Sequence, residues 1–221
     1  MDRLASAHAT PWATTRAAAR RGTRMTELLL VRHGEPEASV RADPGLSAAG
    51  FEQAKRLARW LAAESIDVVV SSPLRRARDT ADTVGDALGL PVAVVDDLRE
   101  WERAGGESGY TVLEHMAADD PRSTALADGR YSDFVPIMDV AAFRERVELG
   151  FGSLFDRYPT GRVVVASHGG AINCFLANIL GLSEIFFFLP DYGSVSRVER
   201  LASGRTVIRS VNETGHLEDR V

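Results

Sequence analysis

The chain has 221 residues, of which 45% are hydrophobic and 26% are charged, and its formal net charge at pH 7 is −5. This composition is typical of a soluble globular protein and gives no sign of a nucleic-acid binder. The single cysteine, Cys174, excludes an internal disulfide, and no apolar run approaches the roughly 20 residues that span a bilayer. We therefore expect a cytoplasmic protein without a nucleic-acid or membrane partner.

The first 24 residues differ in composition from the rest of the chain. They carry five arginines against one acidic residue, Asp2, and otherwise consist mostly of alanine and threonine. Such a stretch is low in the large apolar side chains that a core requires. The sequence therefore predicts a disordered N-terminal extension over residues 1–24 and a single domain over residues 25–221.

From residue 27 onward, short apolar runs alternate with amphipathic stretches, which is the pattern of an α/β sheet with crossover helices. Residues 28–31 form a continuous apolar run, as expected for a strand that is covered on both faces. A turn is indicated at Asp43-Pro44-Gly45, and Ser47 is a suitable N-cap for a helix. Apolar residues then recur at helical spacing over residues 51–61.

The remaining predicted elements continue this alternation. They are strands over residues 67–71, 92–95 and 162–167, a helix with a core face from Ala77 to Leu88 that ends at Gly89, a helix capped by Asp139, an apolar helix over residues 171–180 that ends at Gly181, and two edge strands over residues 194–201 and 206–211. The predicted fold class is a three-layer α/β/α sandwich whose mostly parallel sheet has an antiparallel edge.

Residues 101–138 break the alternation. This segment is rich in glycine, aspartate and proline and is only weakly periodic. A stretch of that length without regular structure is usually a functional lid or a mobile loop. We expect a lid insertion within the single domain.

Polar residues follow three of the predicted strands, at residues 32–35, 71–76 and 167–170. In an open α/β sheet, ligands bind beyond the carboxyl ends of the strands. Arginine stays charged and holds phosphate through forked donors, while imidazole can act as a nucleophile or as a further donor. The glycine after each histidine would let the backbone approach a ligand closely. The sequence therefore predicts a pocket for a dianionic phosphoryl group.

The same three segments carry a resemblance to a known family. Leu-Val-Arg-His-Gly-Glu at residues 30–35, Ser-Ser-Pro-Leu-Arg-Arg-Ala-Arg-Asp-Thr-Ala at residues 71–81 and Ala-Ser-His-Gly-Gly at residues 166–170 resemble, in order and context, the motifs of the histidine phosphatase superfamily, the phosphoglycerate mutase-like group. The likeness runs from about Thr26 to the C-terminus and implies a phosphoglycerate mutase-like fold.

By this resemblance, His33 is the nucleophile and Arg32 binds the phosphoryl oxygens. His168 corresponds to the family's second histidine, which flanks the phosphate, and Gly169 beside it is expected to contribute to phosphate binding. The family's second arginine precedes Ala-x-x-Thr-Ala, which selects Arg76. Since adjacent residues of a helix do not share a face, we expect the neighbouring Arg75 to pair with Asp79 at the surface instead.

The resemblance also implies a proton donor after the third strand, in a Leu-x-Glu context. The segment Asp97-Leu98-Arg99-Glu100 fits this context, so Glu100 is the predicted general acid. Glu102 and Glu107 lie close to it in the sequence and are alternatives.

The chain departs from the family pattern at positions outside the phosphate motifs. Ser39 stands where the family often has an asparagine that contacts phosphate, and whether Ser39 takes over as a donor is left open. Asn173 replaces an arginine that is often found five positions after the second histidine. Residues 101–106 replace a Gly-x-Trp-Glu-Gly stretch. These changes fall where substrate is read rather than where phosphorus is attacked.

The predicted function is hydrolysis of a small phosphorylated metabolite through a phosphohistidine on His33, with Glu100 as proton donor. No histidine and carboxylate cluster at metal-ligand spacing is found, so neither a metal nor another cofactor is expected. The alternatives are a 2,3-bisphosphoglycerate-dependent phosphoglycerate mutase and a non-catalytic phosphate-binding domain. The small substrate is the expected partner, and a homodimer is left open.

Overall fold

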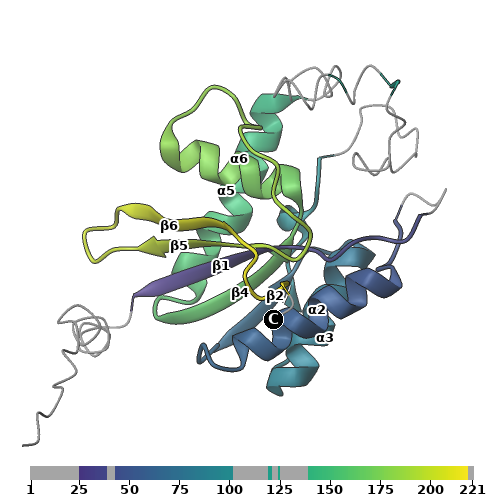
Figure 1. Cartoon of the computed structure of the whole chain (residues 1–221). Helices are drawn as coiled ribbons and strands as arrows, with labels where there is room; N and C mark the ends of the chain where they lie inside the picture. The colour runs from purple at the N-terminus through teal and green to yellow at the C-terminus, as the bar shows by residue number, and fades with distance from the viewer. Residues whose placement is uncertain (1–24, 39–42, 102–118, 121–123, 125–138, 219–221) are drawn as a thin grey trace, which may run out of the picture.

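A computed structural model describes residues 25–38, 43–101, 119–120, 124 and 139–218 (Figure 1). The predicted N-terminal extension and nearly all of the predicted lid lie outside these residues. The elements in chain order are β1 (Thr26–Arg32), α2 (Ala48–Leu61), β2 (Val68–Ser71), α3 (Arg75–Leu88), β3 (Val92–Val94), the 3-10 helix η2 (Asp96–Leu98), α5 (Val140–Arg157), β4 (Gly161–Ser167), α6 (Gly169–Leu180), β5 (Val195–Arg200) and β6 (Thr206–Glu213). Within this part of the chain, no helix has the length and apolar character needed to cross a bilayer.

The strands form one six-stranded sheet in the order β3-β2-β4-β1-β5-β6. The first four strands of that order are parallel, and β5 runs antiparallel to both of its neighbours. The expectation of a mostly parallel α/β sheet is therefore confirmed. The prediction of residues 194–201 as an edge strand is wrong, because β5 pairs with β1 on one side and with β6 on the other. Among the described strands, the edges are β3 and β6.

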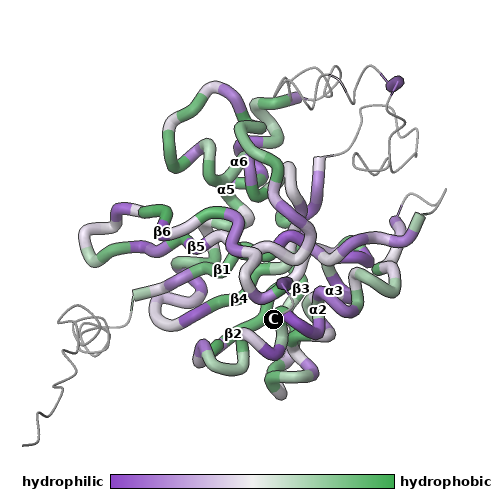
Figure 2. Tube along the Cα trace, viewed as in Figure 1, coloured by the Kyte–Doolittle hydropathy of each residue, from purple (hydrophilic) through white to green (hydrophobic). Residues whose placement is uncertain are grey.

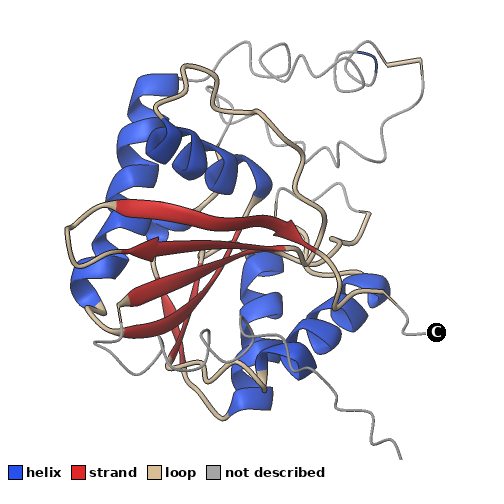
Figure 3. Ribbon diagram, turned by 60° about the vertical axis from the view of Figure 1, so that its left-hand side comes forward, coloured by secondary structure: helices blue, strands red, loops and turns tan. Residues whose placement is uncertain are grey.

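Helices cover both faces of the sheet, so the molecule has the three predicted layers (Figure 3). On one face, α5 and α6 pack against β1 and β4 around Phe151 and Phe175, whose rings stack with centroids 4.8 Å apart. On the other face, α2 and α3 pack against the alternate residues of the same strands, including Leu29 and Val31. Figure 2 shows the hydrophobic residues along the central strands that supply both cores.

The predicted helix ends are confirmed in detail. Ser47 accepts a hydrogen bond from the backbone N–H of Gly50 at 3.0 Å, and Asp139 accepts one from Ala142 at 3.0 Å. Gly89 and Gly181 end α3 and α6 in the left-handed conformation, which glycine adopts without steric cost. The start of α3 has no side-chain cap of its own. Instead the Asp43 carboxylate, from the loop after β1, accepts from the Arg75 N–H at 2.9 and 3.1 Å.

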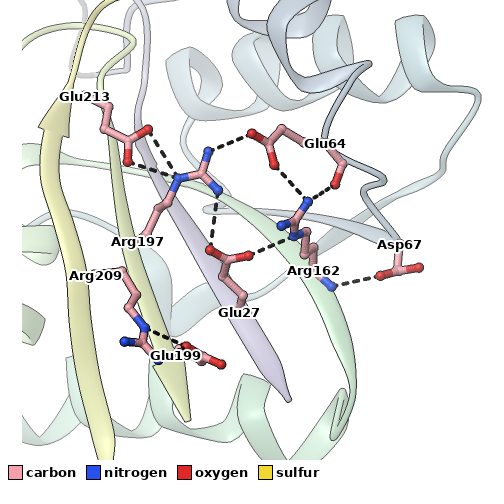
Figure 4. Close-up of polar contacts among 8 residues, drawn as sticks. All are labelled: Glu27, Glu64, Asp67, Arg162, Arg197, Glu199, Arg209 and Glu213. Atoms are coloured by element: carbon pink, nitrogen blue, oxygen red, sulfur yellow. Dashed lines mark hydrogen bonds and ion pairs between the residues drawn. The ribbon is translucent and has the colours of Figure 1, made fainter. Parts of the chain in front are cut away.

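A ring of ion pairs ties five elements together at the side of the sheet that faces α2 (Figure 4). Glu27 and Glu64 alternate with Arg162 and Arg197, and the four side chains close a ring with N–O distances of 2.8 to 3.4 Å. Glu213 of β6 adds a fifth member at 3.0 Å from Arg197. These pairs compensate the charge of Arg197 on β5, which lies inside the sheet.

The topology decides where the polar segments meet. Because β1, β2 and β4 are parallel, their carboxyl ends lie at one edge of the sheet, and β5, which runs the opposite way, begins at that same edge. Val31 of β1 pairs with Ala166 of β4 and with Val195 of β5. The segments after the three parallel strands therefore converge with the loop that precedes β5.

Candidate active site

His33 follows β1 and is almost fully buried, with 2% of its surface exposed. Its Nδ1 lies 2.7 Å from the backbone oxygen of Gly34, which can only accept, so Nδ1 carries the ring proton. The opposite nitrogen, Nε2, accepts a hydrogen bond from Nε of Arg76 at 3.1 Å. Burial, followed by the charges of Arg76 and Arg32, holds the pKa of His33 well below 6.5. At neutral pH the ring is therefore uncharged and its lone pair points toward the guanidinium.

Arg32 is clamped by the loop that precedes β5. One guanidinium nitrogen, Nη1, donates to the backbone oxygen of Pro190, and the ring of Tyr192 lies 3.7 Å from the guanidinium carbon. The N–H of Gly193 donates to the backbone oxygens of Arg32 and His33 at 3.0 and 3.2 Å. This loop therefore fixes both the side chain of Arg32 and the backbone that carries His33.

Arg76 lies on the first turn of α3 and has only 2% of its surface exposed. Its Nη1 is 3.5 Å from Oδ1 of Asp43, the residue that caps α3. Thr80, one turn later, donates to the Arg76 carbonyl at 2.8 Å and accepts from the N–H of Gly34 at 3.0 Å. The segment that follows β1 and the helix that bears Arg76 are thus joined through one hydroxyl group.

The neighbouring Arg75 lies at the surface beside Asp79, as the sequence predicted. It is largely exposed, and its Nε lies 4.0 Å from Oδ2 of Asp79. The assignment of Arg75 to the surface is confirmed, because α3 turns the two adjacent guanidinium groups to different sides.

His168 follows β4, is fully buried, and faces His33 edge-on with 5.2 Å between ring centroids. Its Nε2 lies 2.7 Å from the Ser72 hydroxyl, which comes from the segment after β2. Among the described residues, no group lies within hydrogen-bond distance of the buried Nδ1. Burial, followed by the charge of Arg76, holds the pKa of His168 well below 6.5. A neutral imidazole therefore binds Ser72 through Nε2, while its Nδ1 has no hydrogen-bond partner among the described residues.

The Glu100 carboxyl group is held by two backbone N–H groups, one at the start of α6 and one on the residue that follows Glu100. Oε2 accepts from Gly170 at 2.9 Å, and Oε1 accepts from Trp101 at 3.0 Å. Burial raises the pKa of Glu100, against the opposing pull of these two bonds and of the charge of Arg76. A raised pKa favours the protonated form that a proton donor requires. The alternatives, Glu102 and Glu107, lie outside the described residues, as does Ser39.

Two of the glycines in the motifs are needed because other parts of the protein, rather than a ligand, approach them closely. A Cβ on Gly34 would lie 2.6 Å from the backbone oxygen of Gly50, and one on Gly170 would lie 2.5 Å from Oε1 of Glu100. Gly169 has more space, since a Cβ there would be 3.5 Å from Nε of Arg32. The close approaches at Gly34 and Gly170 are therefore to α2 and to the Glu100 carboxyl group, whereas Gly169 borders Arg32.

The structure adds residues to which the sequence assigned no role. Ser72 is part of a recognised motif, but its contact with His168 depends on how β2 and β4 pair. Tyr192 lies in a segment with no motif, and only the pairing of β5 with β1 brings it to Arg32. Asn173 accepts from the N–H groups of Phe187 and Phe188 at 3.2 and 3.3 Å, so it holds a loop rather than standing in for a phosphate arginine.

Together these groups form a cluster in which the guanidinium groups of Arg32 and Arg76 lie near two neutral imidazoles, with a carboxyl group at the start of α6. Such a cluster suits a phosphoryl group whose charge is spread over its outer oxygens. In the described part of the chain, no three histidine, cysteine, aspartate or glutamate side chains lie close enough together to hold a metal ion.

Comparison with known proteins gives matches over most of the chain. A family profile described as histidine phosphatase superfamily (branch 1) matches residues 28–214. The bifunctional protein Rv2228c of Mycobacterium tuberculosis is 36% identical over 213 residues, which cover 89% of this chain and 56% of that protein. This chain therefore spans about half the length of that relative.

Two further matches span nearly the whole of the matched protein. Phosphoserine phosphatase 1 of Hydrogenobacter thermophilus is 32% identical over 210 residues, which cover 87% of this chain and 95% of that protein. Among solved structures, the mycobacterial glucosyl-3-phosphoglycerate phosphatase Rv2419c superposes with a TM-score of 0.69 at 26% identity, covering 86% of this chain and all of that one.

Proposed function

The chain belongs to the histidine phosphatase superfamily, and from that premise we propose that it hydrolyses small phosphate monoesters through a phosphohistidine on His33. The observation that carries the proposal is the state of His33. Its Nδ1–H is bound to a carbonyl oxygen, and its basic Nε2 is directed at Nε of Arg76. A phosphoryl group drawn to the arginine would therefore meet a neutral nucleophilic nitrogen.

In the first step, the lone pair of His33 Nε2 forms a bond to phosphorus while the bond from phosphorus to the leaving oxygen breaks. The leaving oxygen takes the bonding electron pair and receives a proton from the carboxyl group of Glu100. The raised pKa of Glu100 supports this role because it favours the protonated form. Arg32 and Arg76 stabilise the charge on the phosphoryl oxygens, which is the main catalytic contribution in phosphoryl transfer.

In the second step, water attacks phosphorus and the phosphorus–nitrogen bond breaks, so that His33 regains its lone pair. The Glu100 carboxylate left by the first step accepts a proton from the attacking water, which restores the starting state and releases inorganic phosphate. The same carboxyl group thus acts first as acid and then as base.

His168 supplies a further donor in this scheme. When the Ser72 hydroxyl donates to Nε2 of His168, the ring proton resides on Nδ1, the buried nitrogen without a partner among the described residues. A neutral His168 can then donate to a phosphoryl oxygen while its pKa stays low. Gly169, which borders Arg32, would contribute its backbone to the same oxygens.

The substrate class rests on the matched proteins. The names of two of them, phosphoserine phosphatase and glucosyl-3-phosphoglycerate phosphatase, describe enzymes that act on phosphate monoesters of small metabolites. A small phosphorylated metabolite is accordingly the proposed substrate here. We also place the protein in the cytoplasm, and its one cysteine, buried in α6 with a pKa raised to about 12 by burial, supports a reducing compartment.

The test is a hydrolysis assay with p-nitrophenyl phosphate, phosphoserine and glucosyl-3-phosphoglycerate, using the wild type and the His33→Ala variant. We expect phosphate release by the wild type, no release by His33→Ala, and an acid-labile, alkali-stable phosphoprotein after rapid quenching of the wild type. Phosphate binding without hydrolysis would instead identify a binding domain. Interconversion of phosphoglycerates that requires 2,3-bisphosphoglycerate would identify a mutase.

A further inference from the structure

Arg146 reaches from α5 to the segment that carries Glu100. Its Nη1 donates to the backbone oxygens of Asp97 and Arg99 at 2.9 and 2.8 Å, and its Nη2 donates to the backbone oxygen of Glu100 at 3.1 Å. One guanidinium group therefore binds three carbonyls within four consecutive residues. Bonds from a charged donor are roughly twice as strong as neutral ones.

The bond from Arg146 to the backbone oxygen of Glu100 involves the peptide group between Glu100 and Trp101. The N–H of the same peptide group contacts the Glu100 carboxyl group. In a trans peptide the C=O and N–H point in opposite directions. Arg146 holds the carbonyl of Glu100 on one side of the peptide between residues 100 and 101, so the N–H of Trp101 points to the other side. There it donates to Oε1 of Glu100 at 3.0 Å. The Arg146 guanidinium therefore binds the C=O of this peptide group, and the Glu100 carboxyl group binds its N–H.

Helix α5, which bears Arg146, packs directly against the segment from Asp97 to Glu100. Gly150, one turn further along α5, packs so closely that a Cβ there would lie 3.0 Å from the backbone carbon and oxygen of Asp97. The guanidinium carbon of Arg146 lies 5.0 Å from the ring centroid of Phe143, which is buried in the core on the same helix. Arg146 therefore has little freedom to move away from the carbonyls.

We propose that Arg146 is a positioning residue for Glu100, which it orients through the peptide between Glu100 and Trp101. The proposal rests on the proposed function, in which Glu100 protonates the leaving group. The guanidinium charge also polarises the peptide and strengthens the N–H bond to Oε1. That bond favours the charged carboxylate, so its loss would make Glu100 both less well oriented and more basic.

The test compares Arg146→Met, which removes the donors but keeps an unbranched side chain, with Arg144→Met. Arg144 is a matched control because it lies on the same helix and also binds backbone and side-chain oxygens, those of Asn178, Leu182 and Ser183, at 2.6 to 2.7 Å. Its partners lie at the far end of α6 from Glu100. A purely structural role would give both variants the same phenotype.

The first readout is the dependence on the leaving group. We expect Arg146→Met to lower kcat for phosphoserine by roughly 10- to 100-fold more than for p-nitrophenyl phosphate, whose leaving group needs little protonation, since small displacements of catalytic groups cost up to about 10²-fold. Arg144→Met should change both substrates equally, and Arg146→Lys should fall between the wild type and Arg146→Met. Equal losses for both substrates in Arg146→Met would overturn the positioning role.

The second readout does not depend on activity, so it separates this inference from the proposed function. The side-chain carboxyl carbon of Glu100 can be titrated by NMR in protein labelled with carbon-13 glutamate, with Glu100→Gln to assign the signal. The pKa of Glu100 should rise in Arg146→Met and stay unchanged in Arg144→Met. An unchanged pKa in both would count against Arg146 even if the enzyme is active, and a raised pKa would support it even if no tested ester is hydrolysed.

Discussion

His33 and His168 face each other beside Arg32 and Arg76, and both are held neutral by burial and by these arginines. The two rings differ in the group that binds one of their nitrogens. A backbone oxygen fixes the proton of His33 on Nδ1, which leaves the lone pair on Nε2. Nε2 of His168 instead meets a hydroxyl group, which can donate as well as accept. In the proposed mechanism, this difference suits His33 to attack and His168 to donation.

The Ser72 hydroxyl is the group that binds Nε2 of His168. Its removal should therefore weaken the interaction of His168 with the phosphoryl group. We expect Ser72→Ala to lower kcat/KM for every monoester by about fivefold to tenfold, the equivalent of one hydrogen bond of about 1 kcal/mol. The matched control is Ser71→Ala, because Ser71 is equally buried but donates to the backbone oxygen of Ser72 at 2.8 Å. Steady-state kinetics on both variants checks this, and a larger loss in Ser71→Ala would contradict it.

Gly170 is the second position at which one residue controls the site. A Cβ there would collide with Oε1 of Glu100 at 2.5 Å and with Cδ1 of Trp101 at 2.8 Å. We expect Gly170→Ala to displace the carboxyl group and lower kcat for phosphoserine by on the order of 10²-fold. Gly152→Ala is the control, since a Cβ there meets only the Glu148 side chain at 3.4 Å.

The Gly152→Ala variant should keep its activity and gain up to about 1 kcal/mol of helix stability. Kinetics with phosphoserine, together with thermal unfolding of both variants, provides the measurement. Normal hydrolysis by Gly170→Ala would show that the carboxyl group tolerates displacement.

At the scale of the elements, the hairpin of β5 and β6 holds together parts of the chain that are far apart in sequence. On the side facing α2, Arg197 of β5 binds Glu27, Glu64 and Glu213. At the carboxyl edge, Asn212 exchanges two hydrogen bonds with Asp191 at 2.7 and 2.8 Å, next to the loop that clamps Arg32. The hairpin therefore serves both the stability of the sheet and the position of Arg32, which binds phosphate in the proposed mechanism.

Removing the guanidinium of Arg197 would leave three carboxylates close together and only partly exposed. We expect Arg197→Met to lower the free energy of unfolding by about 2 to 3 kcal/mol, somewhat less than for a fully buried pair. Arg209→Met lies in the same hairpin and breaks one pair with Glu199, in which the arginine side chain is 52% exposed. Its loss should stay below about 1 kcal/mol. Urea unfolding of both variants measures the difference, and similar losses would contradict a special role for the ring.

The sequence alone predicted most elements because their signals are local. The cap at Ser47, the glycine after α3 and the apolar run of β1 each depend on residues within a few positions. The position of β5 could not be predicted, because its charged residues find partners on β1, on β6 and in the segment that follows α2. For the same reason the motifs identified His33 and Arg76, while Tyr192 and Arg146 become visible only once strand order and helix packing are known.

For the whole molecule, the buried histidines predict acid sensitivity. The pKa values of His33, His168 and His216 are lowered in the folded protein, in each case chiefly by burial. Below the usual value of 6.5 the unfolded chain therefore binds more protons than the folded one, and stability falls as pH drops. Each histidine contributes up to about 1.4 kcal/mol per pH unit in this window.

Glu100 has the opposite effect on stability. Because its pKa is raised in the folded protein, the folded state binds more protons than the unfolded chain between pH 4.5 and that raised value, so Glu100 adds stability as the pH falls through this range. Three histidines outweigh one glutamate, so we expect the urea midpoint to fall between pH 7.5 and pH 5.5. Unfolding at fixed urea should also take up protons in that range. A midpoint that is constant or rises on acidification would contradict the buried, neutral state of the histidines.

The clamp on Arg32 has a consequence for the making of the protein. Pro190, Tyr192 and Gly193 hold an arginine that was synthesised about 160 residues earlier. At ribosomal rates of 5–20 residues per second, the nucleophile segment exists for roughly 10–30 s before its clamp has even been translated. A nascent chain can therefore present Arg32 and His33 but cannot yet hold them in working geometry. Under the proposed function, phosphatase activity should therefore appear only after the loop from Pro190 to Gly193 has been translated.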